Sequence, residues 1–84
     1  LSNQVQVYPN PVGNKLNIAL TSSLLGEDAT IEIYDLLGKK ALETSANFSE
    51  NNSYKIDVNQ LNSGVYFLKA KIESQIHVIK FIKL

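Results

Sequence analysis

An alternation of apolar with smaller or polar residues, with a period of two, runs through most of this chain and limits its fold more than any other feature. Leu16, Ile18 and Leu20 follow it, and so do Ile31 and Ile33. Successive side chains of a β-strand point to opposite faces, so each such stretch predicts a strand with one buried and one solvated face. Helical spacing is confined to one segment that is too short for more than one turn. The chain is therefore predicted to be all-β.

Seven stretches carry strand patterns, and residues that favour turns separate them. The expected strands cover residues 4–8, 15–21, 29–36, 39–46, 53–58, 64–72 and 75–83. Their regular spacing is typical of an antiparallel β-sandwich. Gly38 and Gly64 lie in or beside connections, where we expect a positive φ or a close approach of the backbone. Because no internal repeat is present, residues 1–84 are predicted to form a single domain.

The last predicted strand departs from simple alternation. Ile76 and Val78 share one face, whereas Ile79 and Phe81 take the other, so the pattern breaks between residues 78 and 79. Such a break favours either a β-bulge or a central strand that is covered on both faces. His77 falls opposite Ile76 and Val78, on what we interpret as the polar face, and we expect it in solvent or at the rim.

Two prolines frame Asn10 near the start of the chain, in the stretch VYPNPVGNKLNI. Pro9 and Pro11 each fix φ and remove a backbone donor. They also bias Tyr8 and Asn10 toward extended conformations. We therefore expect a stiff corner that ends the first strand and directs the chain into the second.

Composition argues against several classes of function. Eight lysines balance eight acidic residues and arginine is absent, whereas a nucleic-acid-binding domain normally carries a basic stripe. Cysteine is also absent, which excludes disulfides, thiolate metal sites and a cysteine nucleophile. No apolar run approaches the ~20 residues that cross a bilayer, so we expect no membrane span. The chain begins at Leu1 rather than at Met, and we interpret it as a fragment cut from a longer protein.

The residues offer little basis for catalysis. His77 is the single histidine, and a metal site needs a cluster of ligands. The carboxylates are spread over loops and outward strand positions, whereas glycosidase chemistry needs two that converge across a cleft. Neither a nucleophile-elbow serine nor a phosphate-binding glycine loop is present. We expect a domain that is not an enzyme and that uses no cofactor and no metal.

Two other kinds of non-enzymatic domain fit a small sandwich. The first is an adhesive or carbohydrate-binding module, which would need exposed flat aromatic rings. Tryptophan is absent, and the open candidates are Tyr8, Tyr34 and Phe67, for which packing or cover at the rim is a simpler role. The second is a structural spacer beside a catalytic domain, which a parent reading frame continuing well past Leu84 would favour.

Four segments of the chain, taken together, resemble a known family. They are YPNPVGNKLNI (8–18), IEIYDLLGKK (31–40), IDVNQLNSGVYFLKAKI (56–72) and HVIKFIKL (77–84). In this order they resemble the motifs of the type A C-terminal sorting domain of the type IX (Por) secretion system of Bacteroidetes. The motif positions are Tyr8, Pro9, Asn10, Pro11, Tyr34, Asp35, Gly38, Lys39, Leu61, Gly64 and Tyr66.

The resemblance implies both a fold and a function. Domains of this family are seven-stranded, immunoglobulin-like β-sandwiches at the end of a larger cargo protein. The resemblance therefore implies that residues 1–84 are a sorting domain excised from the end of a larger secreted protein. The resemblance implies a non-catalytic signal that takes an N-terminal cargo from the periplasm through the outer-membrane translocon. A sortase-like peptidase usually removes the signal, and the cargo is anchored at the cell surface or released. We expect a monomer with no nucleic-acid partner.

The end of the chain is the candidate contact with the translocon. The residues concerned are Lys80, Phe81, Ile82, Lys83 and Leu84, because C-terminal residues matter for export in this family. An exposed edge strand can be recognised when a partner adds a strand to it. The alternative is that Phe81, Ile82 and Leu84 only complete the core. Both roles can coexist, because a strand needs one face alone for the core.

Overall fold

The computed structural model describes residues 5–20, 28–48 and 52–84 of the chain. In these ranges all regular structure is β-strand, as the alternation predicts. The strands are β1 (Val5–Tyr8), β2 (Lys15–Leu20), β3 (Asp28–Asp35), β4 (Lys40–Asn47), β5 (Ser53–Asp57), β6 (Gly64–Ile72) and β7 (Gln75–Lys83). Their bounds agree with the predicted ones to within a residue at each end. Predicted strand positions 4 and 21 lie outside the described residues.

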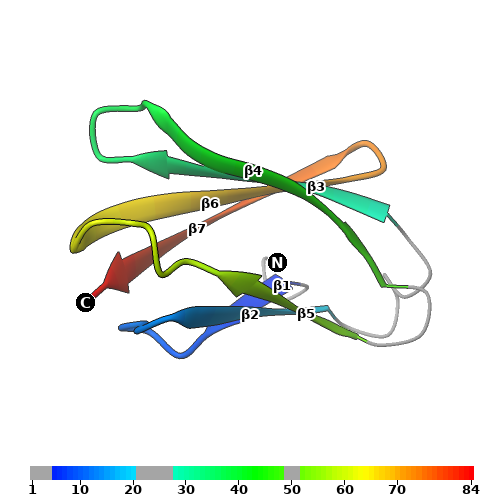
Figure 1. The fold of residues 1–84 in the computed structure, drawn as a ribbon. Helices are drawn as coiled ribbons and strands as arrows, with labels where there is room; N and C mark the ends of the chain where they lie inside the picture. The colour runs from blue at the N-terminus through cyan, green and yellow to red at the C-terminus, as the bar shows by residue number, and fades with distance from the viewer. Residues whose placement is uncertain (1–4, 21–27, 49–51) are drawn as a thin grey trace.

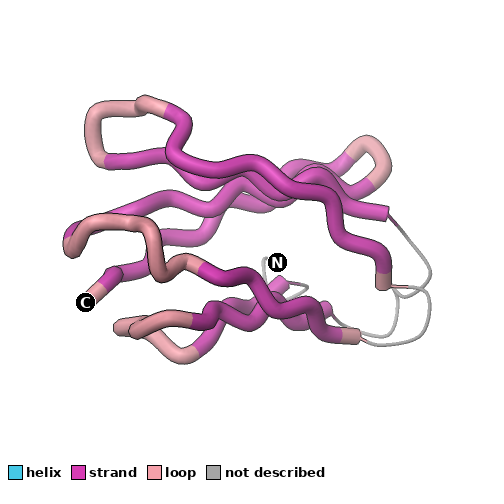
Figure 2. Tube along the Cα trace, viewed as in Figure 1, coloured by secondary structure: helices cyan, strands magenta, loops and turns pink. Residues whose placement is uncertain are grey.

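The strands form two sheets that face each other (Figure 1). Over the described residues one sheet has the order β1-β2-β5 and the other β4-β3-β6-β7, and every pairing between these strands is antiparallel. This confirms the predicted all-β sandwich, while its immunoglobulin-like character stays a prediction. The tube in Figure 2 shows the β3–β4 turn and the β5–β6 connection at one end of the sandwich and the β6–β7 turn at the other. The C-terminus lies at the same end as the β3–β4 turn and the β5–β6 connection (Figure 1).

The core fills the space between the two sheets. Leu16 and Ile18 of β2 and Ile31 and Ile33 of β3 are fully buried, in the phases that the sequence predicts. Burial of an aliphatic side chain of this size contributes about 1.5–3 kcal/mol, so the alternation itself supplies the driving force for packing. The other buried apolar residues are Val5, Val12, Leu20, Ala29, Ala46, Phe48, Ile56, Val58, Tyr66, Leu68, Ala70, Ile72 and Phe81.

Phe48 is a core residue that the sequence analysis left in a loop. It follows β4 directly and is fully buried, with its ring edge-on to Tyr54 at 6.2 Å between centroids. The period of two extends from Leu42 through Ala46 to Phe48, and this extension is the signal that could have placed it.

The turn between β3 and β4 explains the need for Gly38. Its φ is 86°, which confirms the expected positive value. The Gly38 N–H donates to the Asp35 carbonyl at 3.0 Å, and the Asp35 carboxylate accepts the N–H groups of Leu37 and Lys39, both at 2.9 Å. A methyl group at Gly38 would meet no neighbouring atom, so the backbone conformation and not close packing requires glycine. Gly64 likewise has a positive φ, 154°.

The prediction of a bulge or a doubly covered strand at Val78 is wrong. β7 pairs with β6 in unbroken register from Gly64↔Lys83 to Ile72↔Gln75, and it is an edge strand. The register shift lies instead between β3 and β4, near Tyr34. Alternation fails in β7 because Ile76 and Val78 are apolar and yet exposed, at 57% and 61%. His77 is half-buried, on the inward-facing side opposite them, so the face interpreted as polar is the inner one.

Candidate functional site

β7 presents two different faces at the predicted recognition residues. Phe81 is fully buried and stacks on the Tyr66 ring at 5.7 Å between centroids. Lys83 is also buried, and its Nζ donates to the Leu84 carbonyl at 2.8 Å. Lys80, Ile82 and Leu84 are exposed, with Leu84 at 67%. The five predicted residues therefore divide into an inward pair that builds the fold and an outward set that solvent or a partner can reach.

The proline corner holds the end of β7, a contact that sequence analysis missed. The Asn10 Oδ1 accepts the Ile82 N–H at 2.9 Å, although the two residues are 72 positions apart. Val12 then adds a parallel bridge to Lys83: its N–H donates to the Ile82 carbonyl at 2.8 Å, and its carbonyl accepts the Leu84 N–H at 2.9 Å. The outer backbone edge of residues 82–84 is thus already paired. No local signal identifies this contact, because it depends on how the two sheets meet.

The Tyr8-Pro9 and Asn10-Pro11 peptide bonds are both cis. Tyr8 ends β1, so the first strand stops where the prolines predict. The corner carries the chain across from the edge of one sheet to the edge of the other, because β1 pairs with β2 whereas Val12 bridges to Lys83. The corner therefore connects the sheets as well as turning the chain, which is more than the sequence predicted.

Tyr66 ties the β5–β6 connection to the core. Its hydroxyl donates to the Asn62 carbonyl, four residues upstream, at 2.8 Å. A tyrosine near the start of a strand that bonds back to upstream backbone is known as a tyrosine corner, and immunoglobulin-like sandwiches often contain one. Leu61, a motif position of the same connection, is half-buried against the core. Tyr66 thus links this loop to Phe81 of β7.

On the outer face of the four-stranded sheet, the acidic side chains lie on β3 and β4 together with Lys40. Lys40 forms ion pairs with Glu43 at 2.7 Å and Glu32 at 3.5 Å. The Tyr34 hydroxyl donates to Glu32 at 2.9 Å; this bond, together with Lys40 and Lys69, lowers the pKa of Glu32. The same hydrogen bond raises the pKa of Tyr34. Acidic groups therefore gather on β3 and β4, with their charge largely neutralised locally.

β6 and β7 carry the basic side of this face. Lys69 lies over the Tyr34 ring, with Nζ 5.9 Å from the centroid. Lys71 and Lys80 are exposed, and no acidic side chain in the described ranges forms an ion pair with either. The exposed aliphatic residues of β7 alternate along the strand beside these lysines. This surface is therefore both apolar and positively charged.

The match with a protein family decides the identity of the chain. The family of the secretion system C-terminal sorting domain matches residues 6–84. The chain belongs to this family. The match confirms the type IX (Por) resemblance and supports a C-terminal secretion signal, because the family is one of sorting signals and not of catalytic domains. A type IX signal implies export to the cell surface or the extracellular space. None of the curated proteins matches the chain significantly.

The motifs of the sorting domain meet at one end of the sandwich. Asp35 pairs with Tyr66 across β3 and β6, so the second and third motifs are neighbours. A shallow pocket of about 340 Å³ lies there. Its lining joins the β3–β4 turn and the β5–β6 connection through Asp35, Lys39, Lys40, Ala41, Gln60, Leu61, Asn62 and Tyr66. The hydrogen bond between Asn10 and Ile82 joins the first motif (8–18) to the fourth (77–84). The stacking of Phe81 on Tyr66 joins the fourth motif to the third (56–72).

The three aromatic residues that are candidates for carbohydrate binding do not form one flat binding surface. Tyr8 is 47% exposed and belongs to the three-stranded sheet. Tyr34 and Phe67 are half-buried partners on β3 and β6 of the other sheet. The sorting domain thus divides these rings between two sheets, while a sugar platform needs them coplanar and adjacent.

Two kinds of feature are absent from the residues that the structure describes. No group of three or more His, Cys, Asp or Glu side chains is placed to hold a metal ion in those ranges. Nor do they contain a helix long and apolar enough to cross a membrane.

Proposed function

We propose that the sorting domain directs a cargo joined to its N-terminal side from the periplasm through the outer-membrane type IX translocon. A sortase-like peptidase then removes the domain, and the cargo is anchored at the surface or released. The observation that carries the proposal is the family match over residues 6–84. The domain itself does no chemistry in this scheme, and its task is to stay folded and to be recognised.

The outward face of the last strand is the contact that we propose for the translocon. Lys80, Ile82 and Leu84 combine a positive charge with two exposed aliphatic side chains. Phe81 and Lys83 support this face from within, so they act on recognition through the fold. Side chains on one face of a strand can serve a partner while the other face stays in the core.

An export assay with matched variants tests both parts of the proposal. Residues 1–84 are fused behind a periplasmic reporter in a Bacteroidetes strain with type IX secretion, and the reporter is quantified in periplasm, surface and medium. We expect export of the wild-type fusion. The double variant Ile82→Ser/Leu84→Ser should leave most of the reporter in the periplasm while the purified domain still unfolds cooperatively.

Leu37→Ser is the matched control, because Leu37 is an aliphatic residue that is 94% exposed and lies in the β3–β4 turn and not on β7. It should be exported like the wild type. Periplasmic retention of the wild-type fusion would refute the sorting role, and normal export of the double variant would refute the contact on β7. Deletion of residues 80–84 is a poor test, because it also removes Phe81 from the core.

A further inference from the structure

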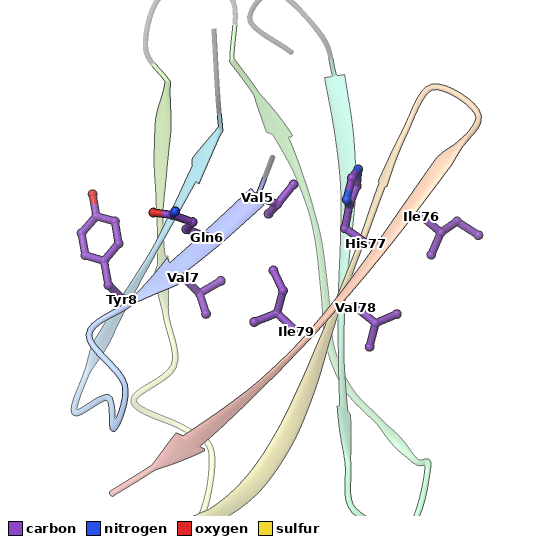
Figure 3. A pocket seen from close by; sticks show the side chains of 8 residues that line it. All are labelled: Val5, Gln6, Val7, Tyr8, Ile76, His77, Val78 and Ile79. Carbon is purple, nitrogen blue, oxygen red and sulfur yellow. The ribbon is translucent and has the colours of Figure 1, made fainter. Parts of the chain in front are cut away.

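A groove separates the edge strands of the two sheets. It has a volume of about 570 Å³ and is lined by residues 5–8 of β1 and 76–79 of β7 (Figure 3). Figure 3 shows the Val7 and Ile79 side chains pointing toward each other across the space between the strands, with Val5 beside them. Ile76 and Val78 turn away from β1 in the same view. The floor of the groove is therefore formed by Val5, Val7 and Ile79 together with the half-buried His77, and the outer edge of β7 forms one wall.

The backbone of this wall has free hydrogen-bonding groups. The N–H and C=O groups of Ile82 bond Asn10 and Val12, so they point away from β6. In an antiparallel pair this orientation recurs at every second residue, so the N–H and C=O groups of Ile76 and Val78 also point away from β6. No described residue pairs with them. They present the hydrogen-bonding pattern that an added strand needs.

The same edge already accepts an extended segment further along. Val12 and Asn10 pair with residues 80–84 by backbone and side-chain hydrogen bonds, in a parallel bridge. The groove begins where this pairing stops, because residues 5–8 of β1 pair with β2 and not with β7. An added strand beside Ile76 and Val78 would continue an interface that the fold itself forms at residues 80–84.

Charge indicates which segment would fit. Lys80 and Lys71 lie on the outer face near this edge, without ion pairs to the described acidic residues. In a strand added to β7, alternate side chains would face the floor, where Val7 and Ile79 supply the apolar surface. The others would face outward beside Ile76, Val78 and Lys80. Apolar residues fit the first set and acidic residues the second.

We propose that the groove between β1 and β7 binds an extended peptide segment of a partner protein, in which apolar and acidic residues alternate. The segment adds to β7 as a strand and bonds the free backbone groups of Ile76 and Val78. This site lies next to the outward face of residues 80–84 and shares only Lys80 with it, and it does not depend on the sorting role. Its existence can therefore be tested on the purified domain alone.

Peptide titration of the purified domain tests the proposal. The probe is a fluorescent synthetic peptide of alternating valine and glutamate, and binding is followed by anisotropy and by shifts of assigned amide resonances. We expect saturable binding with the largest shifts at Ile76 and Val78. Val78→Pro removes one donor from the free edge without removing a bond to β6 and should weaken binding about five- to tenfold, as expected for one hydrogen bond.

Lys55→Pro is the matched control. Lys55 lies on the edge strand β5, which pairs with β2. Backbone hydrogen bonds join Val58 to Asn14 and Asn52 to Leu20, so the backbone groups of residues 52 and 58 point toward the β2 side. Because this orientation alternates along the strand, the Lys55 N–H points away from β2. It should bind the probe as the wild type does. Equal affinity of Val78→Pro, equally tight binding of a valine–lysine peptide, or largest shifts on β4 or β5 would each overturn the proposal. So would a dimer by light scattering that Val78→Pro dissociates, because a second copy would then occupy the edge.

Discussion

At the scale of single residues, Asp57 shows how one side chain joins local and distant parts of the chain. Its Oδ1 accepts the Asn59 N–H at 2.9 Å, and its Oδ2 pairs with Lys15 Nζ of the neighbouring strand at 3.2 Å. The first bond caps the end of β5, and the second holds β5 against β2. The Asn59 N–H, and after it Lys15, lower the pKa of Asp57 below its ordinary value.

This lowered pKa predicts a dependence of stability on pH. The charged carboxylate stabilises the folded state at pH values above the ordinary pKa, and the contribution is lost as the pH falls through the lowered folded pKa. Asp57→Asn keeps an oxygen that can accept the Asn59 N–H and removes only the charge. We expect its thermal midpoint to lie below that of the wild type at pH 7 and to equal it near pH 2. Lys15→Ala should show a smaller effect, and an unchanged difference at both pH values would contradict this account.

At the scale of elements, β7 depends on the corner that precedes β2. Val12 and Asn10 pair the outer edge of residues 80–84 and leave the edge at Ile76 and Val78 open. A free edge exposes unpaired backbone groups that can recruit other strands. One strand is thus protected over its C-terminal half and accessible over its N-terminal half.

Removal of the Asn10 side chain should loosen the protected half alone. Asn10→Ala deletes the acceptor of the Ile82 N–H, and we expect a loss of about 1 kcal/mol in the free energy of unfolding. The Ile82 amide should exchange with solvent hydrogen faster, whereas the Val78 amide should exchange rapidly in both proteins. Asn10→Asp retains an acceptor oxygen and should protect Ile82 nearly as well as the wild type. Unchanged exchange at Ile82 in the alanine variant would show that Asn10 does not hold β7.

At the scale of the whole molecule, a small core shared by two sheets sets the stability. Phe81 belongs to this core and stacks on Tyr66, so the last strand contributes to the fold of the entire domain. Ile82, one residue later, is 42% exposed on the opposite face. Neighbouring positions near the C-terminus therefore have opposite roles.

Urea unfolding should separate these two roles. We expect Phe81→Ala to lower the free energy of unfolding by about 3–5 kcal/mol, a large part of the total of about 5–15 kcal/mol that is typical of a domain. Ile82→Ala should cost less than about 1 kcal/mol, because a large part of its side chain is already exposed. Similar losses for the two variants would mean that β7 does not pack as the structure has it.

Sequence reasoning located the strands well because strand formation here is recorded in a local pattern. Leu16 and Ile18, or Ile31 and Ile33, identify their buried face from neighbours two positions away. Sequence reasoning failed where the polarity of a side chain does not match its exposure in the structure. Val78 is apolar and exposed and His77 is half-buried, since the edge position of β7 and the groove beside it are properties of the assembled sheets.

The sequence by itself determined the all-β class, the position of each strand, the glycine at the β3–β4 turn and the sorting family, because these depend on short-range periodicity, turn conformation and motif order. Only the tertiary structure decided which face of residues 80–84 is available and which part of the β7 edge is free. Those answers depend on contacts such as Asn10 with Ile82, 72 residues apart. A pattern with a period of two fixes the two faces of a strand, and the packing of the sheets decides what lies against each of them.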